Sequence, residues 1–311
     1  MKALSIHLTD VCNSKCTFCI VDSPGMKQDT VLRRRVSRFL REHAGQDYEA
    51  VSLHGGEATI RRDFLEILDE IRELGYPTVF LMTNGRKFAR MDYARTVVEK
   101  GVSLFIVSMH GATAATQDRI SLARGSFDQA VQGIRNLKEL GVAVRTNSVV
   151  CKDNYEELPR IVDLCLGLGT DQVTLSALHT SGTAARNFWE VTPRYDQIRP
   201  YVLEACERVV RSGTRLLLEG FPHCTVPGYE QYLVDWENNK FKVLYRSFVM
   251  DDYEGHMDDF TRVKDARCGG CAFNEVCGGV YKEYAELIGW DEFHPVAQAP
   301  AVPADPSVPV A

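Results

Sequence analysis

Apolar and polar positions follow two different periods along the first 180 residues of the chain. Short runs rich in Val, Ile and Leu predict β-strands, and segments with apolar side chains every three or four residues predict helices. The predicted strands cover residues 3–8, 50–54, 78–83, 103–108, 143–149 and 172–177, and residues 215–219 are a further short candidate beyond them. Because these strands alternate with helices, we expect a parallel sheet with right-handed crossovers.

The six strand–helix units are fewer than the eight of a closed TIM barrel. We therefore expect an α/β fold, a partial (β/α)6 TIM-like barrel with a small C-terminal cysteine-rich extension. Chemistry is expected at the carboxyl ends of the strands, where the loops gather. The predicted divisions are the barrel over 1–212, the cysteine-rich region over 213–294 and a disordered Pro- and Ala-rich tail over 295–311.

Charge and hydropathy narrow the class of protein. The chain has 36 basic and 42 acidic side chains and a net charge of −6, which argues against a dedicated nucleic-acid binder. No window approaches the ~18 consecutive apolar residues of a membrane helix, and the N-terminus lacks the apolar core of a signal peptide. We predict a cytoplasmic protein that binds no membrane.

The chain has ten cysteines, which disulfide bonds do not explain, because the cytoplasm disfavours disulfides. Three of them are spaced Cys-x3-Cys-x2-Cys near the N-terminus, and three are spaced Cys-x2-Cys-x5-Cys near the C-terminus. Clustered thiols without a disulfide role indicate metal binding. We interpret three scattered ones as core thiols, namely Cys151, Cys165 and Cys206.

The first group, Cys12, Cys16 and Cys19, lies in the loop after the first predicted strand. Three thiolates can hold three corners of a [4Fe–4S] cluster and leave one iron open to another ligand, whereas a structural zinc ion would need a fourth protein ligand. From spacing alone, zinc and incidental thiols remain alternatives.

Residues 8–19, Leu-Thr-Asp-Val-Cys-Asn-Ser-Lys-Cys-Thr-Phe-Cys, resemble the signature loop of the radical S-adenosylmethionine (SAM) superfamily. Further motifs follow in that family's order, each at the end of or on a predicted strand. They are His54-Gly55-Gly56-Glu57, Thr83-Asn84-Gly85, Ser108, and the pair Arg145 and Asn147. The resemblance covers about residues 3–180.

The resemblance implies an enzyme whose [4Fe–4S] cluster, bound by the first cysteine group, reductively cleaves SAM to a 5′-deoxyadenosyl radical that abstracts hydrogen from a substrate. It implies that Gly55 and Gly56 let the backbone approach the SAM amine, that Glu57 faces a cation and that Arg145 binds the SAM carboxylate. The remaining predicted cofactor contacts are hydrogen bonds from Thr83, Asn84, Ser108 and Asn147. A reductant such as flavodoxin or ferredoxin is the implied partner, and no catalytic acid or base is assigned.

The second group comprises Cys268, Cys271 and Cys277, with Cys224 preceding it. In isolation these thiols suit either structural zinc or an iron–sulfur cluster. Beside a radical SAM core they resemble the auxiliary-cluster extensions of the SPASM and Twitch subfamilies, which implies one auxiliary [4Fe–4S] cluster. The match is partial, because Tyr281 stands where SPASM proteins carry a further cysteine. Cys224 either completes the cluster or stays free and leaves an open iron for substrate.

Three functions remain for such a chain. The first, which the resemblance favours, is natural product biosynthesis by maturation of a ribosomal peptide through crosslinking, epimerisation or oxidation. Many such maturases carry an N-terminal leader-binding domain, whereas only eleven residues precede Cys12, and a separate peptide-recognition protein could take that role. The alternative, which suits a compact chain, is dehydrogenation, epimerisation or rearrangement of a small molecule such as a sugar, nucleoside or cofactor precursor. The third is a non-catalytic zinc-binding protein, which requires every motif to be idle.

Overall fold

The computed structural model describes residues 2–22, 29–234, 240–246, 248–251 and 260–298. Nine strands form one sheet in the order β7-β6-β5-β4-β3-β2-β1-β8-β9. Their bounds are β1 Lys2–Thr9, β2 Ala50–Gly55, β3 Val79–Thr83, β4 Leu104–Ser108, β5 Ala143–Val150, β6 Gln172–Ala177, β7 Arg215–Glu219, β8 Lys240–Tyr245 and β9 Phe248–Met250. All neighbours are parallel except β8 and β9. Since β7 and β9 form the two edges, the sheet is not closed, and the predicted partial barrel is confirmed.

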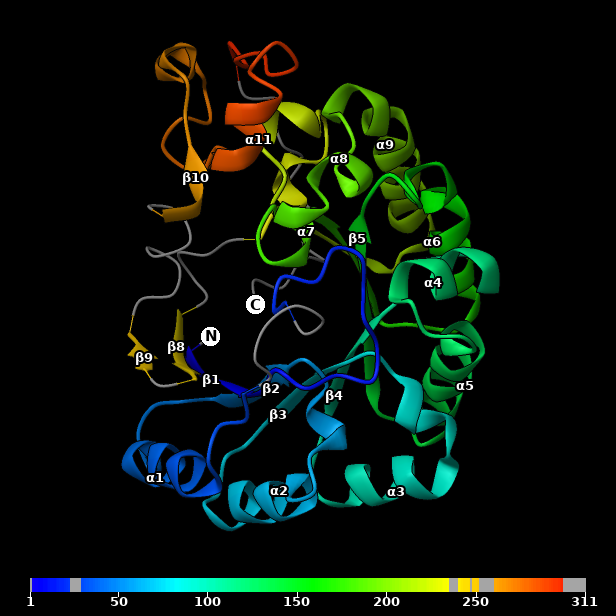
Figure 1. Cartoon of the computed structure of the whole chain (residues 1–311), viewed down its shortest axis with the longest axis vertical. Coiled ribbons are helices and arrows are strands. Elements are labelled where there is room, and N and C mark those ends of the chain that lie inside the picture. The colour runs from blue at the N-terminus through cyan, green and yellow to red at the C-terminus, as the bar shows by residue number, and fades with distance from the viewer. Residues whose placement is uncertain (1, 23–28, 235–239, 247, 252–259, 299–311) are drawn as a thin grey trace.

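Helices cover the convex side of this sheet, as an arc in Figure 1. The longer ones are α1 Arg33–His43, α2 Phe64–Glu73, α3 Met91–Glu99, α4 Ala114–Ser121, α5 Ser126–Glu139, α6 Leu158–Gly167 and α9 Tyr195–Ser212. Two short helices follow β6, α7 Thr183–Arg186 and α8 Phe188–Val191. No helix in the described ranges is both long and apolar enough to cross a bilayer.

Alternation along each strand separates a helix-facing side from a concave side. On β1, Leu4 and Ile6 belong to the first core cluster together with Phe39 of α1. His7 points the other way, where its ring lies 4.7 Å from the ring of Tyr245 on β8. Polar side chains therefore reach the concave side while the apolar ones pack under the helices.

All six predicted strands of the barrel are present. The further short strand predicted over 215–219 is confirmed as β7 at one edge, and the structure adds the β8–β9 hairpin at the other. We did not predict β8, because lysines alternate with its apolar residues and it lies near the edge of the sheet. Although β7, β8 and β9 lie beyond residue 212, they extend the same sheet, and the division at 212/213 stays a prediction.

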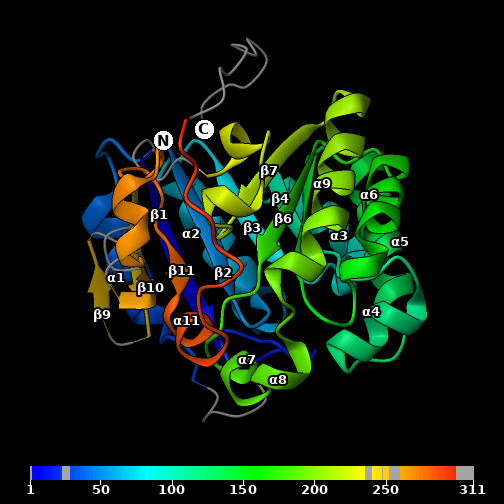
Figure 2. The same ribbon diagram turned by 90° about the horizontal axis from the view of Figure 1, so that it is seen from above.

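The C-terminal extension consists of a two-stranded sheet, β10 Arg262–Val263 and β11 Val280–Tyr281, and helix α11 Lys282–Leu287. Figure 2 shows β11 and α11 above the concave side of the large sheet. Its residues Val280 and Tyr284 belong to the second core cluster together with β6, β7 and α9. The extension is therefore packed onto the barrel. Of the predicted tail, residues 299–311 lie outside the described part of the chain.

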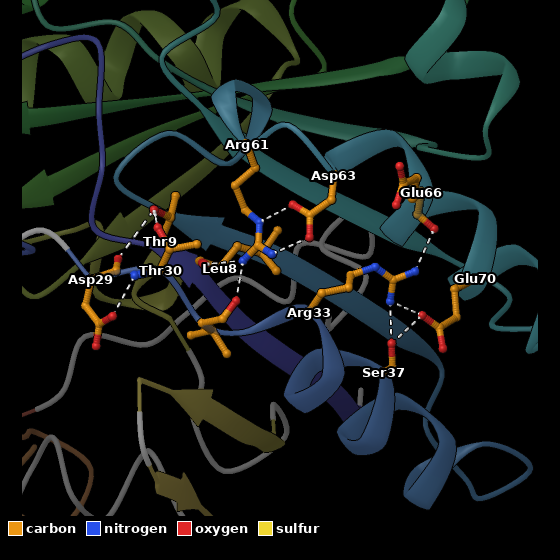
Figure 3. Close-up of polar contacts among 11 residues, drawn as sticks. Leu8, Thr9, Asp29, Thr30, Arg33, Ser37, Arg61, Asp63, Glu66 and Glu70 are labelled. Carbon is orange, nitrogen blue, oxygen red and sulfur yellow. Dashed lines mark hydrogen bonds and ion pairs between the residues drawn. The ribbon is translucent and has the colours of Figure 1, made fainter.

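One arginine clamps the strand that leads to the first cysteine group (Figure 3). Arg61, just before α2, donates to the carbonyl oxygens of Leu8 (2.7 Å) and Val31 (2.8 Å). Its guanidinium also pairs with Asp63 at 2.7 Å. Because Leu8 and Val31 flank the cysteine loop in sequence, Arg61 fixes both ends of that loop.

Candidate functional site

The first three cysteines lie in the loop after β1, at the carboxyl end of the sheet, as predicted. All three are half-buried. Burial raises the pKa of the Cys12 thiol to about 11 and that of Cys16 to about 12, and charge on the neighbouring thiols adds to both shifts. A neighbouring cation is therefore needed to hold Cys12 and Cys16 as thiolates.

Backbone hydrogen bonds fix this cysteine loop from two sides. Its partners are the end of α4 and the start of α7. The bonds are Lys15 N to Ser121 O (2.8 Å), Thr17 N to Ile120 O (3.0 Å) and Thr183 N to Cys19 O (2.9 Å). Asp22 closes the loop through an ion pair with Arg186 and a 2.8 Å hydrogen bond from Thr183.

The two motif glycines pack against the start of this loop. Gly56 N donates to Thr9 O at 2.6 Å, and Glu57 N donates to Val11 O at 2.9 Å. A Cβ on Gly56 would lie 2.5 Å from Val11 O, and one on Gly55, whose φ is +141°, would collide with Thr9 O. Glycine is therefore required here by backbone-to-backbone packing. The predicted approach of these residues to the SAM amine stays a prediction.

Glu57 has a structural partner for each acceptor site. Its carboxylate is fully buried. It accepts hydrogen bonds from Thr59 N (3.2 Å), Thr59 Oγ1 (2.6 Å) and Asn84 N (2.8 Å), and Thr83 Oγ1 lies 3.0 and 2.9 Å from its two oxygens. A carboxylate offers about four lone-pair sites, so protein donors use them all. The observed role of Glu57 is to join the loop after β2 to the end of β3, and its predicted contact with a cation stays a prediction.

Asn84 connects β3 to the cysteine loop. Its Nδ2 lies 2.6 Å from Asn13 Oδ1 and 3.8 Å from Cys12 Sγ, which also accepts from Ser14 N at 3.4 Å. Arg86 donates to Asn84 Oδ1 through its backbone and to Asn13 O through its guanidinium. The Thr-Asn-Gly motif thus holds Cys12 in place.

Ser108 and Asn147 lie opposite each other on β4 and β5. Both are half-buried on the concave side. Asn147 Oδ1 lies 2.8 Å from Ser176 Oγ on β6. These positions allow contact with a molecule inside the barrel, but they do not test the predicted contact with SAM.

Arg145 is the predicted site residue that the structure does not bring to the cysteine loop. It lies opposite Gln172, the first residue of β6. Burial lowers the pKa of Arg145, the positive charge of Arg215 lowers it further, and Asp171 opposes both. These neighbours stand at the amino ends of β6 and β7, and Arg145 precedes the end of β5 by five residues, about 17 Å at ~3.3 Å per residue. The position offers no support for its predicted role as a ligand of the SAM carboxylate.

The four cysteines of the second group line one cavity. Cys224 follows β7 on a short 3-10 turn, His223–Thr225, and Cys268 lies on another, Ala266–Gly270. Burial raises the pKa of Cys224 to about 11, and charge on Cys277 is the next cause. The structure therefore brings Cys224 to the other three thiols, which the sequence left undecided.

Two backbone amides point at sulfur atoms of this group. Gly279 N lies 3.4 Å from Cys277 Sγ, and Val296 N lies 3.4 Å from Cys271 Sγ. Such N–H···S bonds favour thiolates and tune iron–sulfur clusters. Nothing in the local sequence predicts the bond from Val296, which is 25 residues away from its partner.

Sequence reasoning named only Asn147 as a site residue from a set of polar residues that we call the polar junction, defined by Asn147, Ser176, Glu219, Arg262 and Tyr281. Ser176 Oγ links Asn147 to Glu219 Oε2, which is 3.0 Å away. Burial raises the pKa of Glu219, opposed by the Ser176 hydroxyl and the Arg262 charge. Arg262 Nη2 lies 3.4 Å from the Tyr281 hydroxyl. Polar residues at alternate positions of β6 were the only local signal.

The histidines near the site received no catalytic role from the sequence. His110 is buried, and its Nδ1 accepts from Val149 N at 3.2 Å. The His179 ring lies 4.5 Å from that of Tyr281. Among the described residues, the buried Nδ1 atoms of His179 and His223 have no hydrogen-bond partner. The three predicted core thiols are confirmed as fully buried: Cys151, Cys165 and Cys206.

The donor sets fit the groups that the motifs imply. In the described ranges, no three His, Cys, Asp or Glu side chains converge closely enough to hold a single metal ion. A [4Fe–4S] cluster binds each thiolate to a different iron, so its ligands surround a volume and need not meet at a point. Three interacting thiols, and four thiols around a cavity, are sets of that kind.

Comparison with known proteins agrees with the family resemblance of the motifs. The family model of the radical SAM superfamily matches residues 6–165. A probable GTP 3′,8-cyclase of Saccharolobus islandicus is 32% identical over 197 residues, which are 61% of this chain and 61% of the relative. One from Sulfurisphaera tokodaii is 27% identical over 210 residues, 67% of this chain and 66% of the relative. The match to the first relative thus spans about three fifths of its length.

Solved structures share the fold at low sequence identity. SuiB of Streptococcus suis bound to SAM has a TM-score of 0.66 at 16% identity, covering 92% of this chain and 73% of SuiB. Native anSMEcpe with bound AdoMet has a TM-score of 0.62 at 13% identity, covering 91% and 90%. The family implies SAM and one [4Fe–4S] cluster. On its family match, its motifs and its open parallel sheet, this chain belongs to the radical SAM superfamily of enzymes.

Proposed function

We propose that this enzyme acts on a small polar molecule, with a SAM-binding [4Fe–4S] cluster on Cys12, Cys16 and Cys19 and a second cluster on the C-terminal thiols. The curated relatives are named GTP 3′,8-cyclase, which favours the small-molecule alternative over maturation of a ribosomal peptide. SuiB has also been solved with a precursor peptide, but at 16% identity that likeness concerns the fold alone. We take a nucleoside or nucleotide as the first substrate class to test.

The observation that carries this proposal is the polar junction. An amide, a hydroxyl and a carboxylate line up across β5, β6 and β7 on the concave side. The line starts at Asn147, opposite Ser108 of β4, and ends at Glu219, five residues before Cys224. A few polar groups at fixed positions in a concave site are typical of small-molecule recognition, and these three suit the hydroxyl and amino groups of a sugar or nucleoside.

When bound and reduced, the first cluster would supply one electron to SAM, and the radical so formed would remove a hydrogen atom from substrate. The protein's part is to hold the cluster and the substrate in place and to exclude water from them. Asn84 and Ser14 N fix Cys12, while Arg61 clamps the ends of the loop. Glu219 and Asn147 would orient the substrate, and the packed extension would keep water away from it.

The second cluster is of the Twitch or SPASM type in this proposal, and the C-terminal division over 213–294 is the part that would carry it. Support comes from the four thiols around one cavity and from the amides of Gly279 and Val296 that point at two of them. In sequence, Cys224 of this cavity follows Glu219 of β7 by five residues.

Iron and sulfide analysis after anaerobic reconstitution tests both clusters. Wild type should bind about eight irons, and either the Cys12/Cys16/Cys19→Ala or the Cys268/Cys271→Ala variant about four. Cys224→Ala should lose iron from the second site, whereas Cys206→Ala, a buried thiol outside both groups, should keep about eight. About four irons with zinc in wild type would turn the second site into a structural zinc site.

Substrate class is tested with GTP and related nucleosides, SAM and dithionite, by mass spectrometry of 5′-deoxyadenosine and of the candidate substrate. Glu219→Gln should keep iron and SAM binding but lose substrate conversion by at least about tenfold. The exposed Glu286→Gln serves as the control. If nucleosides and sugars are not converted while a peptide is modified, the small-molecule proposal is wrong and maturation of a ribosomal peptide is the better hypothesis.

A further inference from the structure

Arg246 directly follows β8, where the chain turns toward the edge strand β9 (Figure 1). Its φ is +45°, in the left-handed region that Gly and Asn adopt far more readily than arginine. Its side chain is nevertheless only 22% exposed. Because a strained backbone is kept mainly where the side chain it carries has a role, the contacts of Arg246 indicate what that role is.

The guanidinium of Arg246 pairs with Asp10, two residues before Cys12. Arg246 Nε lies 3.1 Å from Asp10 Oδ2, and the Asp10 side chain is 1% exposed. The other oxygen of this carboxylate lies 2.7 Å from His7 Nε2. Asp10 also exchanges hydrogen bonds with the backbone of Asp29, donating from its N at 2.7 Å and accepting at 3.3 Å. A cation from the C-terminal part of the chain thus holds a buried carboxylate at the start of the cysteine loop.

The charge of Arg246 also acts on the other end of the cysteine loop. Asp22, three residues after Cys19, is 4% exposed. Hydrogen bonds from Arg186 hold the pKa of Asp22 below its usual value against the effect of burial, and the charges of Arg186 and Arg246 lower it further. Arg186 comes from α7, within the barrel, whereas Arg246 lies 236 positions after Asp10. One guanidinium therefore acts on the two buried carboxylates that flank the three cysteines.

We propose that Arg246 is a positioning residue for the first cluster, which acts through Asp10, and that its charge raises the reduction potential of that cluster. The inference rests on the proposed cluster of Cys12, Cys16 and Cys19. A [4Fe–4S] cluster becomes more negative when it takes up one electron from a reductant, so a nearby cation favours the reduced form, and net charge helps to set its potential. Two residues span at most about 7 Å of chain, so the ion pair with Asp10 lies close to Cys12.

The expected effect follows from the charge that is removed. A poorly screened unit charge at ~15 Å changes such an equilibrium by roughly sixfold at an effective dielectric constant of about 20. Arg246→Asn removes the charge, while asparagine suits a positive φ. At any fixed potential, its ratio of reduced to oxidised first cluster should be at least about threefold below wild type, which is about 28 mV for one electron. Arg246→Lys keeps the charge and should stay within about twofold of wild type.

The test is a dithionite redox titration of the full, reconstituted enzyme, followed by electron paramagnetic resonance. The signal that changes when SAM is added identifies the first cluster. The matched control is Lys242→Gln on the same hairpin. Lys242 pairs at 2.8 Å with Asp251, whose side chain is 77% exposed, so water screens this charge and the potential should equal that of wild type. The melting temperatures of the metal-free proteins are measured in parallel, because a purely structural role would lower them without ordering the potentials by charge.

The outcomes separate this inference from the proposed function. An unchanged potential in Arg246→Asn overturns the inference, and so does an equal fall in Arg246→Lys or in Lys242→Gln. If Arg246→Asn binds too little iron for the titration, Asp10→Asn decides the matter by the sign of its effect, because removal of the carboxylate should raise the potential. A wild-type enzyme that binds no iron at Cys12, Cys16 and Cys19 would refute the proposed function itself.

Discussion

Glu57→Gln distinguishes the observed role of this residue from the one that its motif implies. The change keeps the size of the side chain but replaces one acceptor oxygen with an amide nitrogen that only donates. The Thr83 hydroxyl can rotate away, whereas the fixed N–H groups of Thr59 and Asn84 cannot. One buried donor is therefore left without a partner, whichever way the amide turns.

The expected loss follows from those contacts. A buried unpaired donor costs about 1–3 kcal/mol, and the remaining bonds lose the advantage of an ionised acceptor, about 1 kcal/mol more. We expect a loss of about 2–4 kcal/mol in the free energy of unfolding. With an unfolding entropy of ~2.1 cal/mol/K per residue over 311 residues, the melting temperature should fall by about 3–6 °C.

The assay is thermal unfolding of the metal-free, SAM-free protein, where cofactor contacts cannot contribute. Glu73→Gln on the exposed end of α2 is the control and should stay within about 0.5 kcal/mol of wild type. SAM binding to the reconstituted variants is measured in parallel. An unchanged melting temperature together with lost SAM binding would show that Glu57 is a cofactor ligand and that the reasoning from its hydrogen bonds is wrong.

Three further predictions concern the same end of the sheet and its opposite. Gly56→Ala should destabilise the protein by about 2–4 kcal/mol and lower the amount of bound iron, because its Cβ would meet backbone oxygens at 2.5 and 2.6 Å. Gly167→Ala, whose Cβ would enter open space in α6, should stabilise the protein by about 0.5–1 kcal/mol. Iron analysis and urea unfolding measure both variants. Arg61 holds the pKa of Asp63 below its usual 3.8. The ion pair therefore stabilises the folded protein above about pH 4, and this stabilisation is lost as the pH falls through the folded pKa of Asp63. Arg61→Leu should lower the free energy of urea unfolding more at pH 7 than at pH 3. Arg145→Met should change the Kd of SAM less than about twofold in equilibrium binding, and a tenfold loss would reinstate its predicted role.

The predictable part of this fold is the part with a strong local pattern. The six barrel strands are short segments rich in Val, Ile and Leu between helical patterns, so they were found. The motifs at their ends located the site because parallel strands bring their carboxyl ends together. β8 was missed since a strand with lysines at alternate positions has no such run.

The sequence could not predict where individual side chains point or which residues far apart in the chain contact one another. Glu57 follows a strand end, as its motif requires, yet only the fold shows its carboxylate turned toward Thr83 and Asn84. Arg145 is the third residue of its strand, and counting from the strand's start would have placed it at the amino end. Glu219 and Arg262 are 43 positions apart, so no local pattern could pair them.

Tyr281 was singled out in the sequence, and only the fold shows where its side chain lies. It stands where SPASM proteins carry a further cysteine, and in this fold it is 5% exposed and does not line the four-cysteine cavity. Its hydroxyl would lie 2.8 Å from a Cβ on Gly220, at the end of β7, and its ring packs against His179. Tyr281 therefore packs toward the barrel, where its hydroxyl lies 3.4 Å from Arg262 Nη2. Its contact with Arg262 therefore links the extension to the proposed substrate site.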